Sequence, residues 1–393
     1  MTGTEARLAR IRGRALPRNH NARTIAALAA NPGCARRAVM DAAGADKQRL
    51  AAYAGFPAPF GQSRFALSRG NAFEAQVKAN GAAELLALLR EHLDLPIPQA
   101  HYDDLSEIGG NTSLDLRHVR TRNLLVRASA DASADTDAGT MFDHPLLRLE
   151  VGGRHAYLEP DLIAFQLNGR FHVIEVKSFA VIDGHADGDK VAAAAIQSAV
   201  YVLALRQLLA GQGIPADAVA DETILVCPRD FSNRPVVAAL DVRKQLTVLR
   251  RQLARIASID ELLDLLPPTL TFDLDPDQDG VPRRKPGDLA DAIRQVDARY
   301  APECLSTCEM CFFCRDEARG RTEALGRQAR EELGGIEHVA TVLRLANTAD
   351  PVSAELAEAA TVLRAAARLR NQALRNQALR NQALRNQAVG EAV

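Results

Sequence analysis

Two apolar, strand-like runs follow each other in the segment LEPDLIAFQLNGRFHVIEVKSF, residues 158–179. The pair Asn168-Gly169 between them is a strong signal for a tight β-hairpin turn. In the second run Glu175 and Lys177 occupy alternate positions, and alternate residues of a strand face the same side of a sheet. The pattern therefore predicts a hairpin whose second strand carries a carboxylate and an ammonium group on one face.

The charges of this hairpin need partners if the strand is buried. Moving two charged groups into so apolar a strand costs several kcal/mol unless a metal ion or another group compensates. Asp161 opens the first run and can lie beside Glu175 across the hairpin. Two carboxylates bind hard divalent cations, and an adjacent lysine can orient or deprotonate an attacking water. The pattern outlines a site for phosphodiester cleavage, with a solvated strand face as the alternative.

A long apolar helix is predicted directly after the hairpin, in VAAAAIQSAVYVLALRQLLA, residues 191–210. Gln197 and Tyr201 are one helical turn apart, so they lie on the same face of this helix. One interpretation is that these two polar side chains border the metal site and contact substrate phosphate or base. The other is that they are ordinary polar residues on the surface of a helix.

The order of these motifs resembles that of the PD-(D/E)xK nucleases of the RecB type. The matching residues are Asp161, Glu175-x-Lys177 and Gln197-xxx-Tyr201. Upstream, Gly70-Asn71-Ala72-Phe73-Glu74 looks like the family's first motif, in which a His or Glu on a helix completes the metal site. A helix first-turn acid is the alternative for Glu74. The resemblance spans residues 70 to 201, and the order of its motifs is more specific than any single one.

The resemblance implies an α/β fold with a restriction-endonuclease-like core, in which helices flank a mixed central β-sheet. It also implies Mg²⁺ or Mn²⁺ held by Asp161 and Glu175, with Glu74 as a third acid. Lys177 would position or activate water and stabilise charge on the phosphate. The residues that the resemblance implies as catalytic are Asp161, Glu175, Lys177, Gln197 and Tyr201.

The cysteines carry a second prediction. Beyond Cys34 and Cys227, four thiols fall within a short stretch, at Cys304, Cys308, Cys311 and Cys314. Such a cluster, in a chain without a recognisable secretory leader, argues against disulfides and for a metal or iron–sulfur site. The spacing is not that of a zinc ribbon, and the cluster contains no histidine. Cys227 ends an apolar run and is predicted to be a core residue that behaves as a small hydrophobe.

The family resemblance sharpens this prediction. Some RecB-type nucleases, including the iron–sulfur nucleases of CRISPR adaptation and AddB, carry one cysteine before the nuclease core and three after it. Those four hold a [4Fe–4S] cluster that joins the helical N- and C-terminal parts. The ligands implied here are Cys34, Cys304, Cys308 and Cys314, with Cys311 as an alternative ligand. The downstream spacing departs from the family's common CxxCx5C, so a local cluster of four cysteines without Cys34 remains open.

Charge and composition limit how the chain can bind its partners. The 393 residues contain 48 Lys and Arg against 49 Asp and Glu, a net charge of −1, so attraction to nucleic acid must come from local patches. Aromatic residues make up 4% and tryptophan is absent, which disfavours binding by extensive base stacking. The basic N-terminus lacks the apolar core of a leader, and every long apolar run is interrupted by charge. We therefore expect a cytoplasmic protein with no membrane span.

The chain divides into seven predicted segments. They are a flexible arm (1–20), a helical N-terminal part with the first cluster cysteine (21–127), a disordered loop (128–141), the nuclease core (142–260), a C-terminal cysteine-cluster region (261–320), a helical extension (321–368) and a low-complexity tail (369–393). The central sheet is expected to begin with the run LLRLEV, residues 146–151. The tail holds four copies of Arg-Asn-Gln-Ala-Leu/Val and is predicted to be an exposed cationic helix or coil.

The function expected from these features is that of a metal-dependent deoxyribonuclease. The resemblance favours exonuclease-like action on single-stranded or end-processed DNA, in repair and recombination or in defence against foreign DNA. The sequence contains no GxxxxGK[ST] phosphate-binding loop, so any unwinding must come from a helicase or a defence-system partner. The alternative is a non-catalytic DNA-binding or adaptor protein on the same fold, stabilised by an iron–sulfur cluster or zinc.

Overall fold

The computed structural model describes most of the chain, in two compact units. The described residues are 3–31, 33–58, 64–93, 99–107, 113–131, 138–151, 154–167, 170–230, 232–257, 259–349 and 351–390. The first unit comprises Met1–Arg299 together with Ser306–Met310, and the second comprises Tyr300–Leu305 together with Cys311–Val393.

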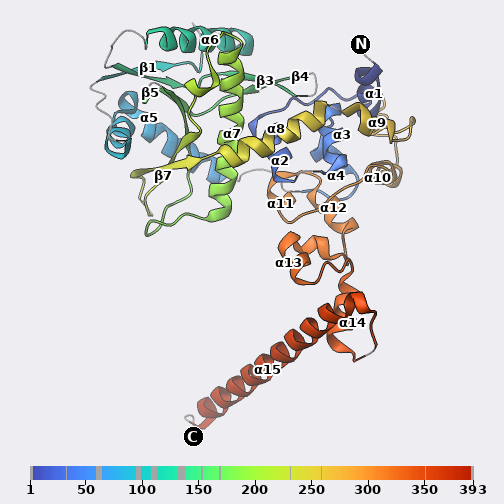
Figure 1. Ribbon diagram of the computed structural model, residues 1–393. Helices are drawn as coiled ribbons and strands as arrows, with labels where there is room; N and C mark the ends of the chain where they lie inside the picture. Colours follow the sequence, from blue (N-terminus) through green and yellow to red (C-terminus); the bar gives the residue numbers. More distant parts are fainter. Residues whose placement is uncertain are drawn as a thin grey trace. The chain divides into compact units, whose positions relative to one another are not determined.

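A mixed six-stranded sheet forms the centre of the first unit (Figure 1). Its strands, in spatial order, are β1 (Gln99–Asp104), β2 (Ala138–Asp143), β5 (Leu162–Leu167), β6 (Arg170–Val176), β7 (Glu222–Pro228) and β8 (Pro235–Asp241). The β1–β2 and β6–β7 pairs are parallel, and the other neighbours are antiparallel. This arrangement confirms the predicted α/β class with a mixed sheet and flanking helices.

The predicted hairpin is present as the antiparallel pair β5–β6, in which Leu162 lies opposite Ile174. Its predicted turn, Asn168-Gly169, lies outside the described residues. The chain then crosses from β6 to the parallel strand β7 through helix α7 (Gly188–Ala210), because parallel neighbours need a long crossover. The helix at 191–210 was therefore predicted at nearly its observed bounds.

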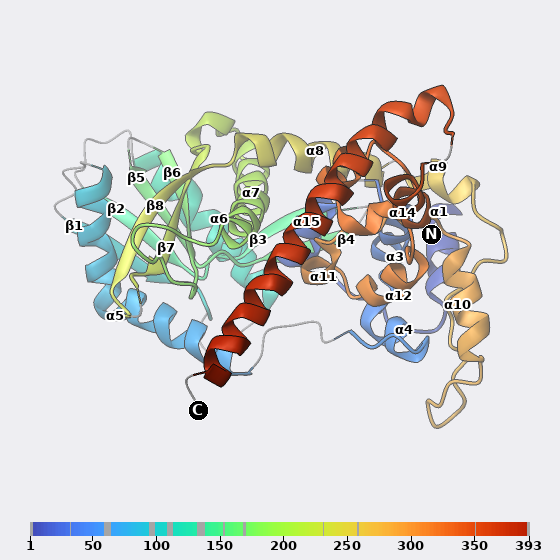
Figure 2. The same ribbon diagram turned by 90° about the horizontal axis from the view of Figure 1, so that it is seen from below.

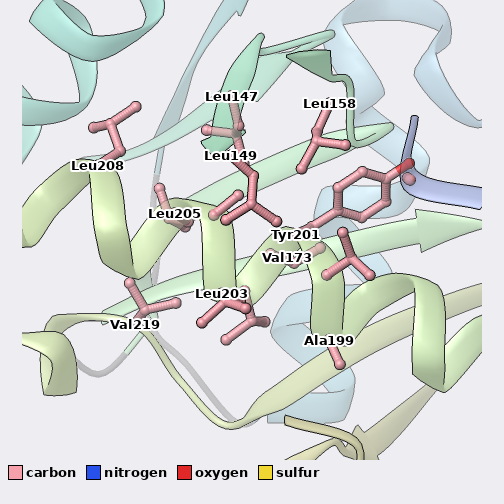
Figure 3. Close-up of a cluster of buried hydrophobic side chains, with 14 of the residues drawn as sticks. Leu147, Leu149, Leu158, Val173, Ala199, Tyr201, Leu203, Leu205, Leu208 and Val219 are labelled. Carbon is pink, nitrogen blue, oxygen red and sulfur yellow. The ribbon is translucent and has the colours of Figure 1, made fainter. Parts of the chain in front are cut away.

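Alternate residues of β6 face two different helices. Phe171 and Val173 pack in the cluster that includes α7, whereas Ile174 and Val176 pack against α5 (Arg64–Leu93). In Figure 2 the strands lie between these two helices. Figure 3 shows the α7 side of the core. Each leucine fully buried there contributes roughly 1.5–3 kcal/mol, so this apolar packing fixes the face toward which Glu175 points.

Helix α7 is the one described helix that is long and apolar enough to cross a membrane by length and composition. More than half of the qualifying window, 56%, is buried inside the fold. Leu203, Leu205 and Leu209 belong to the core, which is the position expected of a central helix in a folded domain.

The first unit also contains a set of helices outside the sheet. They are α1 (Gly3–Arg12), α2 (Ala22–Ala30), α3 (Ala35–Ala43), α4 (Lys47–Tyr53), α6 (Leu114–Asp131), α8 (Arg243–Ala257), α9 (Ile259–Asp264), α10 (Pro286–Arg294) and the short 3₁₀ helix η1 (Ala216–Ala218). Of the predicted flexible arm over residues 1–20, residues 3–12 form the helix α1. Leu8 and Ile11, three residues apart on α1, are both buried and tie this segment to the fold.

Two other predictions about the sheet region need correction. Of the predicted loop 128–141, residues 128–131 end α6 and residues 138–141 begin β2, while 132–137 lie outside the described residues. The run at 146–151 does not begin the central sheet. It forms β3 (Leu147–Val151), which pairs with β4 (Arg154–Leu158) in a separate two-stranded sheet. The alternating burial of β3 directs its apolar residues toward α7.

The second unit is helical. Its elements are α12 (Cys311–Glu317), the 3₁₀ helix η2 (Thr322–Leu325), α13 (Arg327–Glu332), α14 (Val339–Asn347) and α15 (Ala354–Gly390), while the residues of α11 (Cys304–Thr307) are divided between the two units. A small core contains Val342, Leu345 and Leu363. The repeat tail continues α15 as one long helix (Figure 1), in which Leu369, Leu374 and Leu379 are 68%, 56% and 64% exposed. Residues 391–393 lie outside the described residues.

Candidate active site

Glu175 is the most deeply buried acid of the predicted site. It lies near the end of β6, and only 1% of its surface is exposed. Its Oε1 atom accepts a hydrogen bond from the Lys177 ammonium group, whereas Oε2 has no hydrogen-bond partner among the described residues. Burial raises the pKa of Glu175 to about 8, and the charge of Asp161 adds to that rise.

Asp161 lies next to Glu175 because the hairpin brings the start of β5 beside the end of β6. Its Oδ2 atom accepts a hydrogen bond from the backbone N–H of Val176 over 2.6 Å. Burial raises the pKa of Asp161, against the opposing charge of Lys177. The two acids are thus neighbours that repel each other when both are ionised.

A chain of hydrogen bonds links the end of β6 to α7. The Lys177 ammonium donates to Glu175 and also to Gln197 Oε1 over 3.2 Å, and Gln197 Nε2 donates to the Tyr201 hydroxyl over 3.0 Å. Burial alone would lower the pKa of Lys177, but the charges of Glu175 and Asp161 outweigh it and raise the pKa. Burial also raises the pKa of Tyr201, so its hydroxyl stays neutral. The structure therefore brings together five of the six site residues that the sequence predicted.

Glu74, the sixth predicted residue, lies on α5 at the edge of this group. It is not in the first turn of a helix, because α5 begins at Arg64. Its Oε1 atom pairs with the ammonium group of Lys78, one turn further along. The negative charge of Glu74 raises the pKa of both Asp161 and Glu175, so it belongs to the same electrostatic neighbourhood. Among the described residues, however, no three His, Cys, Asp or Glu side chains are gathered as a ready set of metal ligands.

The structure adds polar residues that the sequence prediction missed. Lys78 pairs with Asp143 Oδ1 over 2.6 Å as well as with Glu74, and Asp143 accepts a hydrogen bond from the Tyr102 hydroxyl. Burial alone would lower the pKa of Lys78, but its hydrogen bonds to Asp143 and Glu74 raise it, so it remains charged. These residues come from α5, β1 and β2, and no local spacing connects them.

His144 follows Asp143 and is held by two further groups. Its Nδ1 atom is 3.0 Å from Glu159 Oε1, and its carbonyl oxygen accepts a hydrogen bond from Arg117 Nη2 over 3.0 Å. Its hydrogen bond with Glu159 raises the pKa of His144. The residue has φ of 49°, a left-handed conformation that non-glycine residues seldom adopt. Pro145 favours an extended backbone at the residue before it, so the local sequence does not signal this left-handed conformation.

The site as a whole contains more acidic side chains than permanently charged basic ones. Three permanent cations, Lys78, Arg117 and Lys177, lie among a larger set of carboxylates. These are Glu74, Asp143, Glu159, Asp161 and Glu175. A buried carboxylate oxygen without a partner among the described residues, in an acid-rich group of oxygen donors, fits the ligand preference of a hard divalent cation such as Mg²⁺ or Mn²⁺.

The cysteines are all described, and no disulfide joins any of them. The four at 304–314 are buried, as is Cys227 in β7, while Cys34 is half-buried and stands before the first turn of α3. Within the second unit, Tyr300 lies close enough to Cys304, Cys311 and Cys314 for their charge to raise its pKa, although burial is the larger cause. Burial raises the pKa of the Cys227 thiol to about 12, as expected for an inert core residue.

Comparison with known proteins assigns no family. No protein-family model matches this chain, and no curated protein sequence matches it. One solved structure to which the chain is similar is the crystal structure of SSO0001. The two are 16% identical with a TM-score of 0.18, over 55% of this chain and 83% of the other. So weak a likeness carries no information about function.

Proposed function

We propose that this protein is a metal-dependent nuclease of the PD-(D/E)xK, RecB type that hydrolyses phosphodiester bonds in DNA. The observation that carries this proposal is the Glu175 carboxylate, which is 1% exposed and lies beside Asp161 and Lys177. Its Oε2 atom has no hydrogen-bond partner among the described residues. Burial of a carboxylate with one oxygen left without a hydrogen bond costs several kcal/mol of folding free energy. A divalent cation bound by both Glu175 and Asp161 would offset that cost. A restriction-endonuclease-like core is the fold that goes with this site.

Asp161 and Glu175 would hold Mg²⁺ or Mn²⁺, with Glu74 as a third acid. The bound cation would supply a Lewis acid for the phosphate and a water of lowered pKa. Lys177 is fixed by Glu175 and Gln197 while 27% of its side chain stays exposed, so its ammonium can orient water and offset charge on the phosphate.

Gln197 and Tyr201 continue this polar row along α7 and would align the substrate strand. Their hydrogen bond orients the Gln197 amide, whose oxygen accepts from Lys177. Tyr201 is 4% exposed, so its protonated hydroxyl would act by holding the Gln197 amide in place. Single-stranded or end-processed DNA, exonuclease-like action and a helicase or defence-system partner are proposed from the family resemblance. A cytoplasmic location is proposed from the sequence pattern alone.

We also propose that the cysteines hold a [4Fe–4S] cluster through Cys34, Cys304, Cys308 and Cys314, with Cys311 as the alternative ligand. Thiolates are the ligands that iron–sulfur clusters prefer, and four buried cysteines within residues 304–314 supply them. Iron–thiolate bonds would close a very long loop in the chain, so the role assigned to the cluster is structural.

Cleavage of end-labelled DNA tests the catalytic proposal. Wild type and Glu175→Gln are incubated with single- and double-stranded DNA in Mn²⁺, in Mg²⁺ and in EDTA. Glu222→Gln, the same change at an exposed position of the neighbouring strand β7, is the matched control. We expect metal-dependent cleavage by wild type and Glu222→Gln and a loss of at least about 100-fold in Glu175→Gln. Equal cleavage by Glu175→Gln would remove the proposed site.

A further inference from the structure

Lys78 lies between two carboxylates at the edge of the proposed metal site. Its ammonium group pairs with Glu74 Oε1 and with Asp143 Oδ1, the latter over 2.6 Å, and Nζ is 3.1 Å from His144 Nε2. The side chain is 9% exposed, so this charge is largely shielded from solvent. Glu74 and Asp143 thus share a resident cation.

The two carboxylates differ in how firmly they are held. Asp143 ends β2, is 5% exposed and also accepts a hydrogen bond from the Tyr102 hydroxyl on β1. Glu74 projects from α5 and is 26% exposed at its side chain, and beyond Lys78 its Oε1 atom is 3.7 Å from His144 Nε2. Glu74 is therefore the partner that is able to move, and Asp143 is the fixed one.

The pairing of Glu74 with Lys78 engages one of the three acids proposed as metal ligands. Asp161 and Glu175 are neighbours, and Glu74 is near enough to raise the pKa of both, yet the described acids do not form a gathered set of three ligands. One oxygen of Glu74, Oε1, is engaged by the ammonium group of Lys78.

We propose that Lys78 is an internal counter-cation that competes with the divalent metal for Glu74, and that Asp143 retains Lys78 when Glu74 turns to the metal. This inference rests on the proposed metal site and names the residues that set its affinity. Two positive charges at one carboxylate repel each other, so Lys78 weakens the binding of a metal ion by Glu74. Asp143 lets Glu74 turn to the metal because it keeps the buried ammonium paired.

The proposal predicts opposite effects for two neutralising substitutions. Lys78→Met removes the competitor, so Mn²⁺ should bind about tenfold more tightly, as expected for the loss of one partly shielded charge near a divalent ion. Asp143→Asn leaves Glu74 as the carboxylate that pairs with Lys78 among the described residues, so Mn²⁺ should bind about tenfold more weakly. If Lys78 and Asp143 only stabilised the fold, both substitutions would weaken Mn²⁺ binding.

The test is Mn²⁺ binding to the full-length protein without DNA, measured by the electron paramagnetic resonance signal of free Mn²⁺. Lys78→Arg keeps the positive charge, so its Mn²⁺ affinity should stay within about twofold of that of wild type. Lys190→Met is the control, because Lys190 is an exposed lysine paired with Asp187 over 3.7 Å. Circular dichroism melting of each variant establishes folding. Lys78→Gln, which keeps a hydrogen-bond donor between the carboxylates, replaces Lys78→Met if that variant does not fold.

The outcomes separate this inference from the proposed function. Wild type that binds no Mn²⁺ would overturn both. Wild type that binds Mn²⁺, together with a Glu175→Gln variant that does not, would support the metal site. Within that result, weaker or unchanged binding by the neutral Lys78 variant would overturn the role of Lys78 alone, as would an Asp143→Asn variant that binds as tightly as wild type.

Discussion

The backbone N–H of Val176 donates to the carboxylate of Asp161 over 2.6 Å, which ties the first residue of the Asp161–Leu167 run to the position directly after Glu175. This bond depends on the register of the β5–β6 hairpin, in which Leu162 faces Ile174. A shift by one residue would turn Glu175 to the other face of the sheet. The hairpin backbone, and not the flexibility of the side chains, therefore sets the separation between Asp161 and Glu175.

Lys177 is expected to act in turnover without helping metal binding. Lys177→Met should lower kcat by about 10²–10⁴-fold, because the ammonium that orients water and offsets charge on the phosphate is lost. Mn²⁺ affinity should be unchanged or higher, since a cation next to Glu175 has been removed. Steady-state cleavage rates and Mn²⁺ titrations check both parts, with Lys190→Met as control. A loss of metal binding that matches the loss of rate would contradict this role.

The metal-free protein is expected to lose stability as the pH rises. The pKa of Glu175 is about 8 in the folded chain against an ordinary value of 4.5, so the folded state holds a proton that the unfolded state releases. Between these pH values the unfolded state binds fewer protons, and the free energy of unfolding therefore falls with pH. Melting temperatures in EDTA from pH 5 to 9 should decline in wild type and decline less in Glu175→Gln.

Metal binding should show the reverse dependence on pH. A proton on Glu175 competes with the cation, and that proton is lost as the pH approaches about 8. Mn²⁺ affinity should increase from pH 6 to 8 and then level off, and added Mn²⁺ should raise the melting temperature most at the upper end. An affinity that is constant across this range would contradict a raised pKa at the ligand.

Substitution of the cysteines should distinguish the ligands of the proposed cluster from Cys227, which is a core residue. After anaerobic purification, Cys304→Ser, Cys308→Ser and Cys34→Ser should lose iron and melt at lower temperature, because each removes one thiolate from the proposed cluster. Cys227→Ala should keep its iron, since Cys227 is buried in β7 against apolar residues. Iron and acid-labile sulfide per chain give the readout. A Cys311→Ser variant without iron, beside a Cys34→Ser variant with iron, would favour the local cluster.

Leucines at two helical positions should differ in their contribution to stability. Leu205 in α7 is fully buried, and Leu205→Ala should lower the free energy of unfolding by about 2–5 kcal/mol. Leu374 in the repeat tail is 56% exposed, and Leu374→Ala should change it by less than about 0.5 kcal/mol. Urea denaturation followed by circular dichroism compares the two. A large effect at Leu374 would reveal a packing partner for the tail.

Local patterns predicted the parts of the site that lie close together in the chain. The alternation around Glu175 predicted β6, the spacing of Gln197 and Tyr201 placed both on one face of α7, and the hairpin brought Asp161 to Glu175. These relations depend on strand and helix periodicity, which a sequence displays directly.

The remaining features depend on contacts between distant segments. Lys78, Tyr102 and Asp143 come from α5, β1 and β2, and no periodicity relates them. The helix α1 is held by the burial of Leu8 and Ile11, which its short basic sequence does not reveal. Likewise the apolar alternation of β3 is the same whether it joins the central sheet or pairs with β4 alone.

Anomalous scattering from crystals grown with Mn²⁺ tests the central claim most directly. We predict one anomalous peak at about 2.0–2.3 Å from Glu175 Oε2 and from a carboxylate oxygen of Asp161, the range of divalent metal–oxygen bonds. Crystals of Glu175→Gln grown under the same conditions should lack that peak. A saturating Mn²⁺ concentration that leaves this position empty in the wild type, or that places the metal away from both carboxylates, would contradict the proposed catalytic site.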